Sequence, residues 1–244
     1  IIKNGPAERR HFLDSELCQL DKVYLYQLSN YNKVVLQRNK LLKELYLHPD
    51  YREVLDVLDM QLVQYGSALI QRRQTFAEEL GEIVHRIHSQ LSGGQEEMEL
   101  KYEPNVTVDA FAQMLFANRE RDMRLKTTAT GPHRDDISFV VNGVDIRKFG
   151  SQGQQRTAAL SLKLSEIELV KRLIGDTPVL LLDDVLSELD SGRQNYLLNS
   201  IENIQTLITC TGLDEFVNHR FSINRIYKVT DGSVTVENKQ EADR

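Results

Sequence analysis

The sequence contains few cysteines, no long apolar run and no excess of positive charge. Cys18 and Cys210 are the only cysteines and form no CxxC pair, which argues against a disulfide framework and favours a reducing cytosol. No apolar stretch approaches the roughly 18 residues of a membrane-spanning helix, and no signal peptide opens the sequence, so a cytoplasmic protein without membrane association is expected. The net charge of −6 excludes a general attraction to nucleic acid; any DNA contact needs a local basic patch.

The sequence also lacks the P-loop that cradles nucleotide phosphates. The pattern GxxxxGK[ST] does not occur, and no Gly-Lys dipeptide is found in the 244 residues. The first residue is Ile rather than Met, so we expect a fragment or a partly ordered chain. Hydrophobic residues make up 41% and charged residues 27% of the sequence, as in ordinary soluble globular proteins.

The most informative stretch spans residues 149–190. It opens with a glycine-bearing turn, FGSQGQQRT, which leads into a helical pattern of about five turns. The unpaired N–H groups and the positive dipole end of such a helix start suit an anion such as a phosphate. The apolar run 179–182 then ends at Asp183 and Asp184. This pattern predicts a buried parallel strand that delivers carboxylates to the edge of a sheet.

Three motifs in this order resemble the core of the ABC-type ATPases. These are a signature motif at 151–154, a Walker B strand ending at Asp183, and a D-loop of the SxLD form at 187–190. GPHRDD at 131–136, followed by FGSQGQQRT and LLLDDVLSELD, further resembles the RecF family of bacterial DNA replication and repair proteins, which are SMC-like ATPases. The resemblance runs through the whole chain, including PAERRHFLD near the start and YNKVVLQRN at 31–39.

The resemblance implies a role for each motif residue. The ATP-contacting signature comprises Ser151, Gln152, Gly153 and Gln154. The Ser151 hydroxyl and the Gly153 amide would contact the γ-phosphate of a nucleotide held by a second subunit; an ordinary capped helix is the alternative.

The acidic residues have implied roles as well. Asp183 would hold Mg²⁺ through a water molecule in the nucleotide site of the intact protein, because Mg²⁺ keeps several waters and shares its shell with phosphates. Asp184 stands where transporters carry the glutamate that polarises the attacking water, and Ser187 and Asp190 belong to the D-loop. The alternative is that both aspartates cap the loop that follows.

The family resemblance further implies a recombination mediator with ATP and Mg²⁺ as cofactors. The intact protein would form an ATP-dependent homodimer on DNA at junctions of single and double strands, hydrolyse ATP slowly, and work with RecO and RecR. The present chain, without a P-loop, is expected to be inactive alone. Two alternatives remain open: a nucleotide-binding subunit of another ABC-type ATPase, and a non-enzymatic coiled-coil interaction module.

Hydrophobic periodicity predicts the remaining organisation, an α/β fold. Apolar residues at three- and four-residue steps predict helices over 14–47 and 51–91, which pair antiparallel. We expect an irregular lead-in at 1–13, a helical hairpin subdomain at 14–94 inserted into an ABC-type head, and the signature, Walker B and D-loop lobe at 95–244. We also predict a helix from Thr107 to about Leu125, and hairpins across Asn142-Gly143 and Asp231-Gly232. Beyond Asp184 we predict a helix capped by Asp190 or Ser191 and then a strand at 207–209, which together form a βαβ crossover.

The string LSGGQ at 91–95 matches the transporter signature letter for letter, but it lies where a helix is predicted to end. Gly93 or Gly94 is expected to be a left-handed C-cap, and the residues that follow, 98–102, are predicted to form a strand. A working signature must begin a helix, so we interpret this string as a helix terminus.

Several basic and histidine residues have competing interpretations. Arg72-Arg73 is interpreted as a solvated charged turn of the long helix, and His85 and His88 as solvated positions. His133 and Arg134 either face nucleotide or DNA or are structural. Thr211 is a candidate to replace the histidine that senses the γ-phosphate in transporters. Candidates for a local DNA-binding patch are Arg9, Arg10, Lys22 and Arg38.

Overall fold

The computed structural model describes residues 1–44, 52–211 and 223–237. The chain forms two compact units, Ile1–Asp176 and Thr177–Arg244. No helix in the described ranges is both long and apolar enough to cross a membrane.

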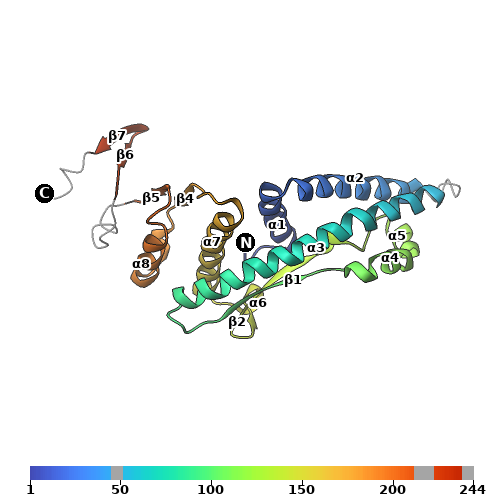
Figure 1. Cartoon of the computed structure of the whole chain (residues 1–244), viewed down its shortest axis with the longest axis horizontal. Coiled ribbons are helices and arrows are strands. Elements are labelled where there is room, and N and C mark those ends of the chain that lie inside the picture. The colour runs from blue at the N-terminus through green and yellow to red at the C-terminus, as the bar shows by residue number, and fades with distance from the viewer. Residues whose placement is uncertain (45–51, 212–222, 238–244) are drawn as a thin grey trace. The chain divides into compact units, whose positions relative to one another are not determined.

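Three helices begin the first unit: α1 (Pro6–Leu20), α2 (Lys22–Glu44) and α3 (Arg52–Leu91). As predicted, α2 and the 40-residue α3 lie side by side and run in opposite directions (Figure 1). Gly66 permits a close approach on α3, because a Cβ there would lie 2.5 Å from the Phe111 ring and 2.9 Å from the Tyr31 ring.

Two predictions about these helices were wrong. Residues 1–13 are not irregular throughout, since α1 starts at Pro6, where a proline is compatible with the first helical position. The predicted helix over 14–47 is interrupted at Asp21, which has an extended backbone. Its carboxylate accepts hydrogen bonds from the Val23 amide (2.8 Å) and the Tyr24 amide (3.0 Å), so it caps α2.

A three-stranded antiparallel sheet packs against α3 in the order β1 (Met98–Glu103), β2 (Asp136–Val141) and β3 (Val144–Asp145). Alternate residues of β1 are buried, as expected for a strand with one covered face. The predicted hairpin is confirmed: Asn142 and Gly143 both have positive φ, as a type I′ turn requires.

Short helices complete the first unit. The predicted helix from Thr107 is divided at Asn118 into α4 (Val108–Ala117) and α5 (Arg119–Leu125), and η2 (Pro132–Arg134) precedes β2. After β3 come α6 (Ile146–Phe149) and α7 (Gln152–Ile174), and α7 packs against α3.

The second unit contains the predicted βαβ crossover. Strands β4 (Leu180–Asp183) and β5 (Thr206–Thr209) are parallel, and the chain between them forms η3 (Leu186–Glu188) and α8 (Ser191–Ser200). Strands β6 (Ile226–Thr230) and β7 (Ser233–Glu237) form the predicted hairpin at Asp231-Gly232. The burial expected for β4 is only partial: Leu182 is buried, whereas Leu181 is 72% exposed. The α/β class is confirmed.

Candidate nucleotide-binding motifs

The predicted signature residues begin helix α7. The Ser151 hydroxyl accepts a hydrogen bond from the Gln154 amide (3.2 Å), and the Gln154 side-chain oxygen accepts one from the Ser151 amide (3.1 Å). This reciprocal pair is a capping box, and it satisfies two of the amides that a helix start leaves unpaired. The prediction that this string opens a helix is confirmed, and Gln152 and Gly153 form the first helical positions.

Gln154 also connects the start of α7 to the end of α3. Its side-chain nitrogen donates to Glu96 Oε1 at 2.9 Å, and Glu96 Oε2 lies 3.2 Å from His88 Nε2. The other ring nitrogen of His88 lies 2.9 Å from the Ser161 hydroxyl of α7. His88 is fully buried, so the prediction that it is solvated was wrong; His85 is exposed, as predicted.

The LSGGQ string lies at the end of α3, as predicted. The helix stops at Leu91, and Gly93 and Gly94 both take left-handed backbone conformations, with φ of +64° and +79°. The Gly94 amide donates to the Ser89 carbonyl at 2.7 Å, which closes the helix terminus. Strand β1 follows at Met98. The exact match to the transporter signature therefore supplies carbonyl groups, not the free amides that an anion needs.

The two Walker B aspartates lie at the carboxyl end of β4 and are both exposed. Asp183 accepts a hydrogen bond from the Thr209 hydroxyl of the neighbouring strand at 2.5 Å. The Asp184 amide donates to Thr209 as well, to the carbonyl at 3.2 Å and the hydroxyl at 3.1 Å. Sequence reasoning missed Thr209; the only available signal was its position at the end of the adjacent parallel strand.

Asp184 has a backbone conformation that few side chains adopt, with φ of +50°. Aspartate tolerates the left-handed region better than most residues, but the conformation still costs free energy. Within the described residues no hydrogen bond to its carboxylate is recorded, and no group of three His, Cys, Asp or Glu side chains is arranged to hold a metal.

The D-loop residues stabilise the turn that follows. The Ser187 hydroxyl donates to the Asp184 carbonyl at 2.9 Å. Asp190 is the N-cap of α8, as predicted: it accepts a hydrogen bond from the Arg193 amide (3.0 Å) and forms an ion pair with the Arg193 guanidinium (2.7 Å). The backbone hydrogen bond from Arg193 lowers the pKa of Asp190. Thr211, the candidate replacement for the transporter histidine, lies just after β5 and is exposed.

Comparison with known proteins identifies the family, although no protein-family model matches the chain. The chain is 61% identical over 236 residues to the DNA replication and repair protein RecF of Agathobacter rectalis, covering 97% of this chain and 65% of that protein. It is 60% identical over 240 residues to RecF of Lachnospira eligens, covering 98% and 66%. The chain belongs to the RecF family.

Solved RecF structures have the same fold as this RecF-family chain. One, of the recombination mediator RecF with ATP in the RecFOR pathway, superposes with a TM-score of 0.87 at 35% identity and covers 98% of this chain and 65% of its own. A second, of RecF-ATPrS, gives a TM-score of 0.84, also at 35% identity, over 97% of this chain and 64% of its own. The match confirms the predicted fold class, the signature and Walker B part of an ABC-type head with a helical pair. The chain spans about 65% of the length of the relatives that it matches.

The loop GPHRDD of the RecF-family chain is fixed by buried contacts. The Tyr31 hydroxyl lies 2.7 Å from His133 Nδ1, and His133 Nε2 lies 2.9 Å from the Thr128 carbonyl. Burial lowers the pKa of His133 to about 4, so the ring is neutral, accepts from Tyr31 and donates to Thr128. The structural interpretation of His133 therefore holds, whereas Arg134 is exposed.

Arg73 is buried rather than solvated, so the interpretation of Arg72-Arg73 was wrong for its second residue. The guanidinium forms ion pairs with Asp14 (2.7 Å) and Asp135 (2.9 Å) and also donates to the Pro132 carbonyl (2.7 Å). Burial alone would lower the pKa of Arg73, but the surrounding negative groups hold it above its ordinary value. Arg72 does remain partly exposed.

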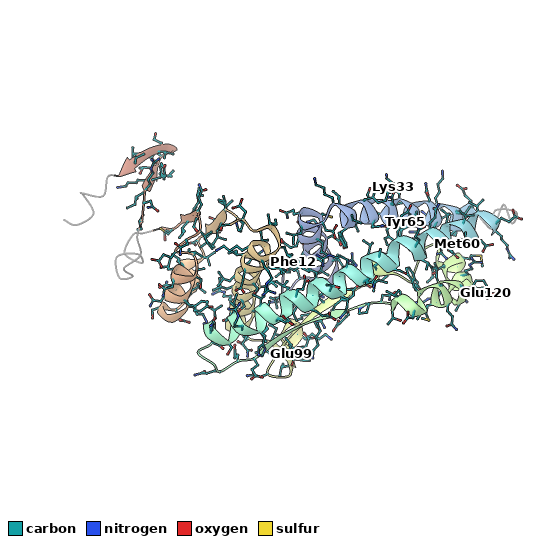
Figure 2. The ribbon with its side chains drawn as sticks, viewed as in Figure 1. Phe12, Lys33, Met60, Tyr65, Glu99 and Glu120 are labelled. Carbon is teal, nitrogen blue, oxygen red and sulfur yellow. The ribbon has the colours of Figure 1, made fainter. Side chains whose placement is uncertain are left out.

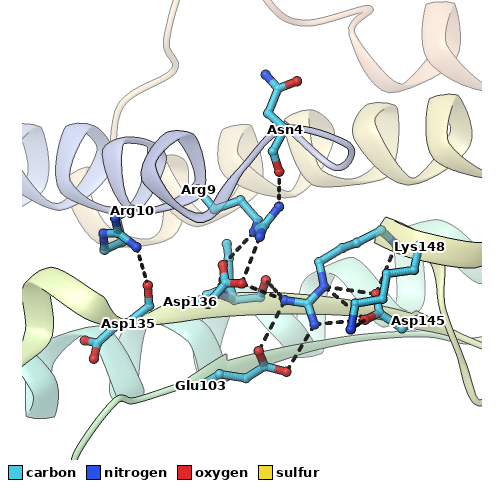
Figure 3. A network of polar contacts seen from close by, with 10 residues as sticks. Asn4, Arg9, Arg10, Glu103, Asp135, Asp136, Asp145 and Lys148 are labelled. Carbon is cyan, nitrogen blue, oxygen red and sulfur yellow. Dashed lines mark hydrogen bonds and ion pairs between the residues drawn. The ribbon is translucent and has the colours of Figure 1, made fainter.

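The predicted basic patch is contradicted at two of its four positions. Arg38 is fully buried and forms ion pairs with Asp59 (2.6 Å) and Asp122 (2.7 Å). Arg9 is also buried and faces Asp136 at the start of β2, with two hydrogen bonds of 2.6 and 2.8 Å (Figure 3). These guanidinium groups are committed to internal carboxylates, so they are not available to phosphates. Of the remaining two residues, Arg10 donates to the Asp135 carbonyl at 2.7 Å, and Lys22 is exposed.

Proposed function

We propose that the protein to which these residues belong is an ATP-dependent DNA repair protein. It binds ATP between two copies, forms a homodimer on DNA at junctions of single and double strands, and hydrolyses ATP slowly, with RecO and RecR as partners. In this proposal residues 14–94 form the helical hairpin subdomain and residues 95–244 the ATPase lobe. The first 13 residues lead in from the preceding part of the ATPase.

The arrangement of residues at the start of α7 gives the strongest support for a phosphate-binding role. Ser151 and Gln154 satisfy each other, while Gln152 and Gly153 present first-turn amides at an exposed helix start. Gly153 has no internal reason to be glycine, because a Cβ there would meet only the Ser151 hydroxyl, at 3.9 Å. Glycine is nevertheless a poorer helix former than alanine, because it loses more backbone conformational entropy on folding. A partner that approaches the backbone closely from outside, such as a phosphate, accounts for this cost.

The end of β4 fits a magnesium–nucleotide ligand. Asp183 offers exposed carboxylate oxygens, which are the hard ligands that Mg²⁺ prefers, and the Thr209 hydroxyl orients the group. One protein carboxylate suffices, because Mg²⁺ fills the rest of its shell with waters and phosphates. When bound, Mg²⁺ would neutralise charge on the phosphates. Asp184, held in a left-handed conformation beside it, is assigned as the general base for the attacking water.

Residues 1–244 alone are expected not to bind ATP. Without GxxxxGK[ST] it has neither the backbone cradle nor the lysine that hold ATP phosphates. Isothermal titration of residues 1–244 with Mg-ATP is expected to give no measurable heat of binding.

The two signature-like strings provide the decisive experiment. In the full-length protein Ser151→Arg is expected to preserve ATP binding by the monomer and to abolish the ATP-dependent dimer, because the arginine fills the space above the α7 start. Ser92→Arg is the comparison variant: it places the same side chain at a helix C-terminus, where a cation is favourable by about 0.3–1 kcal/mol, and it removes only the local Ser92 hydrogen bonds to Ser89 and Glu96. Size-exclusion chromatography with and without ATP separates the two. A dimer that survives Ser151→Arg but not Ser92→Arg would overturn the assignment.

A further inference from the structure

One face of α2 carries lysines in a regular line. Lys22, Lys33, Lys40 and Lys43 are all exposed, and together with Tyr26, Ser29 and Leu36 they follow one another at steps of three and four residues. Such steps place side chains above one another on a single helix face. We call Lys22, Lys33, Lys40 and Lys43 the lysine stripe.

The lysine stripe is free of internal partners in the part of the chain that the structure describes. None of its four amines has a recorded ion pair with a described residue, whereas Arg38, on the opposite side of the same helix, is buried between two aspartates. Figure 2 shows Lys33 on the side of α2 that lies away from α3. The only acidic residue of the helix is Glu44, at its last position. Ordinary exposed helix faces intersperse both signs of charge.

We propose that the lysine stripe binds the phosphate backbone of duplex DNA. This inference rests on the proposed function, since it assumes that the intact protein binds DNA, and it assigns the surface that does so. It also replaces the patch predicted from the sequence, of which only Lys22 remains in the stripe.

The dimensions of the stripe suit a duplex. Lys22 and Lys43 are separated by 21 residues, which corresponds to about 32 Å along a helix. One DNA strand presents a phosphate about every 3.4 Å along the helix axis, so the stripe is as long as about nine phosphates. The Tyr26 and Ser29 hydroxyls add hydrogen-bond donors of the kind that contact phosphate and sugar.

Single-stranded DNA fits the stripe less well. Binding of a single strand relies on aromatic side chains on which successive bases stack. Tyr26 is the one aromatic residue in line with the stripe. The contacts proposed here are therefore electrostatic and independent of base sequence.

The test uses the full-length protein with ATP and measures fluorescence anisotropy of a labelled duplex about 30 base pairs long, over about 50 to 200 mM salt. The variant combines Lys22→Gln, Lys33→Gln and Lys40→Gln, which keep helix propensity nearly unchanged. The matched control combines Arg121→Gln, Arg124→Gln and Lys126→Gln, which remove the same charge from exposed positions of α5 and its C-cap.

We expect the stripe variant to bind at least about tenfold more weakly near physiological salt and to lower the salt slope by about 2.7, or 0.9 for each lost phosphate contact. The control should stay within about twofold of the wild type. A variant with arginine at Lys22, Lys33 and Lys40 should bind like the wild type, because the charge is kept.

The possible negative results of this experiment distinguish the proposed function from the lysine stripe. A wild-type protein that does not bind duplex would refute the DNA-binding part of the proposed function. Wild-type binding that the stripe variant retains would overturn the lysine stripe alone. An equal loss in the α5 control would also overturn it, because the effect would then be one of net charge.

Discussion

Replacing Arg73 with alanine is expected to destabilise the first unit severely, whereas the same change at Arg72 is not. The two arginines are neighbours on α3, but the Arg73 side chain is 2% exposed and the Arg72 side chain 27%. Arg73 has three charged or carbonyl partners at 2.7–2.9 Å, contributed by α1 and by the loop at 132–135. Arg72 forms looser pairs, of 3.3 Å to Asp21 and 3.9 Å to Glu79.

The size of the destabilisation follows from the buried carboxylate that loses its ion-pair partner when Arg73 is removed. Without Arg73, the Asp135 carboxylate stays fully buried with only the Tyr102 hydroxyl and the Asn105 amide as partners. Removing one member of a buried ion pair costs about 3–5 kcal/mol, mainly through the uncompensated charge. A partly exposed pair such as that of Arg72 contributes about 0–1 kcal/mol.

Urea denaturation followed by far-UV circular dichroism measures both variants against the wild type. Asp135→Asn in the Arg73→Ala background provides the internal check, because it removes the orphaned charge and should restore part of the lost free energy of unfolding. Equal destabilisation by Arg72→Ala and Arg73→Ala, or no recovery in the double variant, would refute the reasoning.

Three further predictions concern the motif residues and pH. Asp184→Asn in the full-length protein is expected to keep ATP binding and to prolong the ATP-bound dimer, because an amide keeps the shape but cannot accept a proton; hydrolysis at the wild-type rate in a phosphate-release assay would exclude the assigned role. Glu96→Ala should weaken the ATP-dependent dimer by about three- to tenfold, because it removes one hydrogen bond to Gln154. Analytical ultracentrifugation measures the dimer, and Glu97→Ala, a change at the exposed neighbouring residue, should leave it unchanged. Burial raises the pKa of Glu166 from 4.5 to about 7, so the folded state binds the proton more tightly and stability falls as pH rises from about 4.5 to 7. Glu166→Gln should therefore match the wild type near pH 4.5 and exceed its unfolding free energy by about 1–3 kcal/mol at pH 8; urea titrations with no such divergence would contradict the raised pKa.

Local chemistry made the motif elements predictable. The starts of α7 and α8 were predicted because Ser151 and Asp190 are side chains that cap the amides just ahead of them in the chain. The end of β4 was predicted from an apolar run that stops at two aspartates, and the turn of the β2–β3 hairpin from Asn-Gly. Each signal lies within a few residues of the structure that it specifies, so it can be read without knowing the fold.

The failures concern partners that are distant in the sequence. Arg38 meets Asp122, 84 residues away, and Arg73 meets Asp135, 62 residues away. No local sequence pattern distinguishes a buried arginine of this kind from a solvated one, because its ion-pair partners lie on distant parts of the chain. The break at Asp21 was missed for another reason: the apolar periodicity continues on both sides of it. The aspartate caps α2 through hydrogen bonds that it accepts from the amides of Val23 and Tyr24.

The helix terminus at 91–95 bears on how ATPase motifs are searched for. Gly93 and Gly94 occupy left-handed backbone conformations with open space around the missing Cβ atoms, so glycine is favoured there by backbone geometry alone. A folding requirement can therefore preserve the same letters that nucleotide binding preserves in a transporter. A comparison of letters alone does not show whether a string begins or ends a helix. Here the string with the better match, LSGGQ, lies at the C-terminus of α3. A motif scan that also asks whether the residues open or close a helix would choose FGSQGQ.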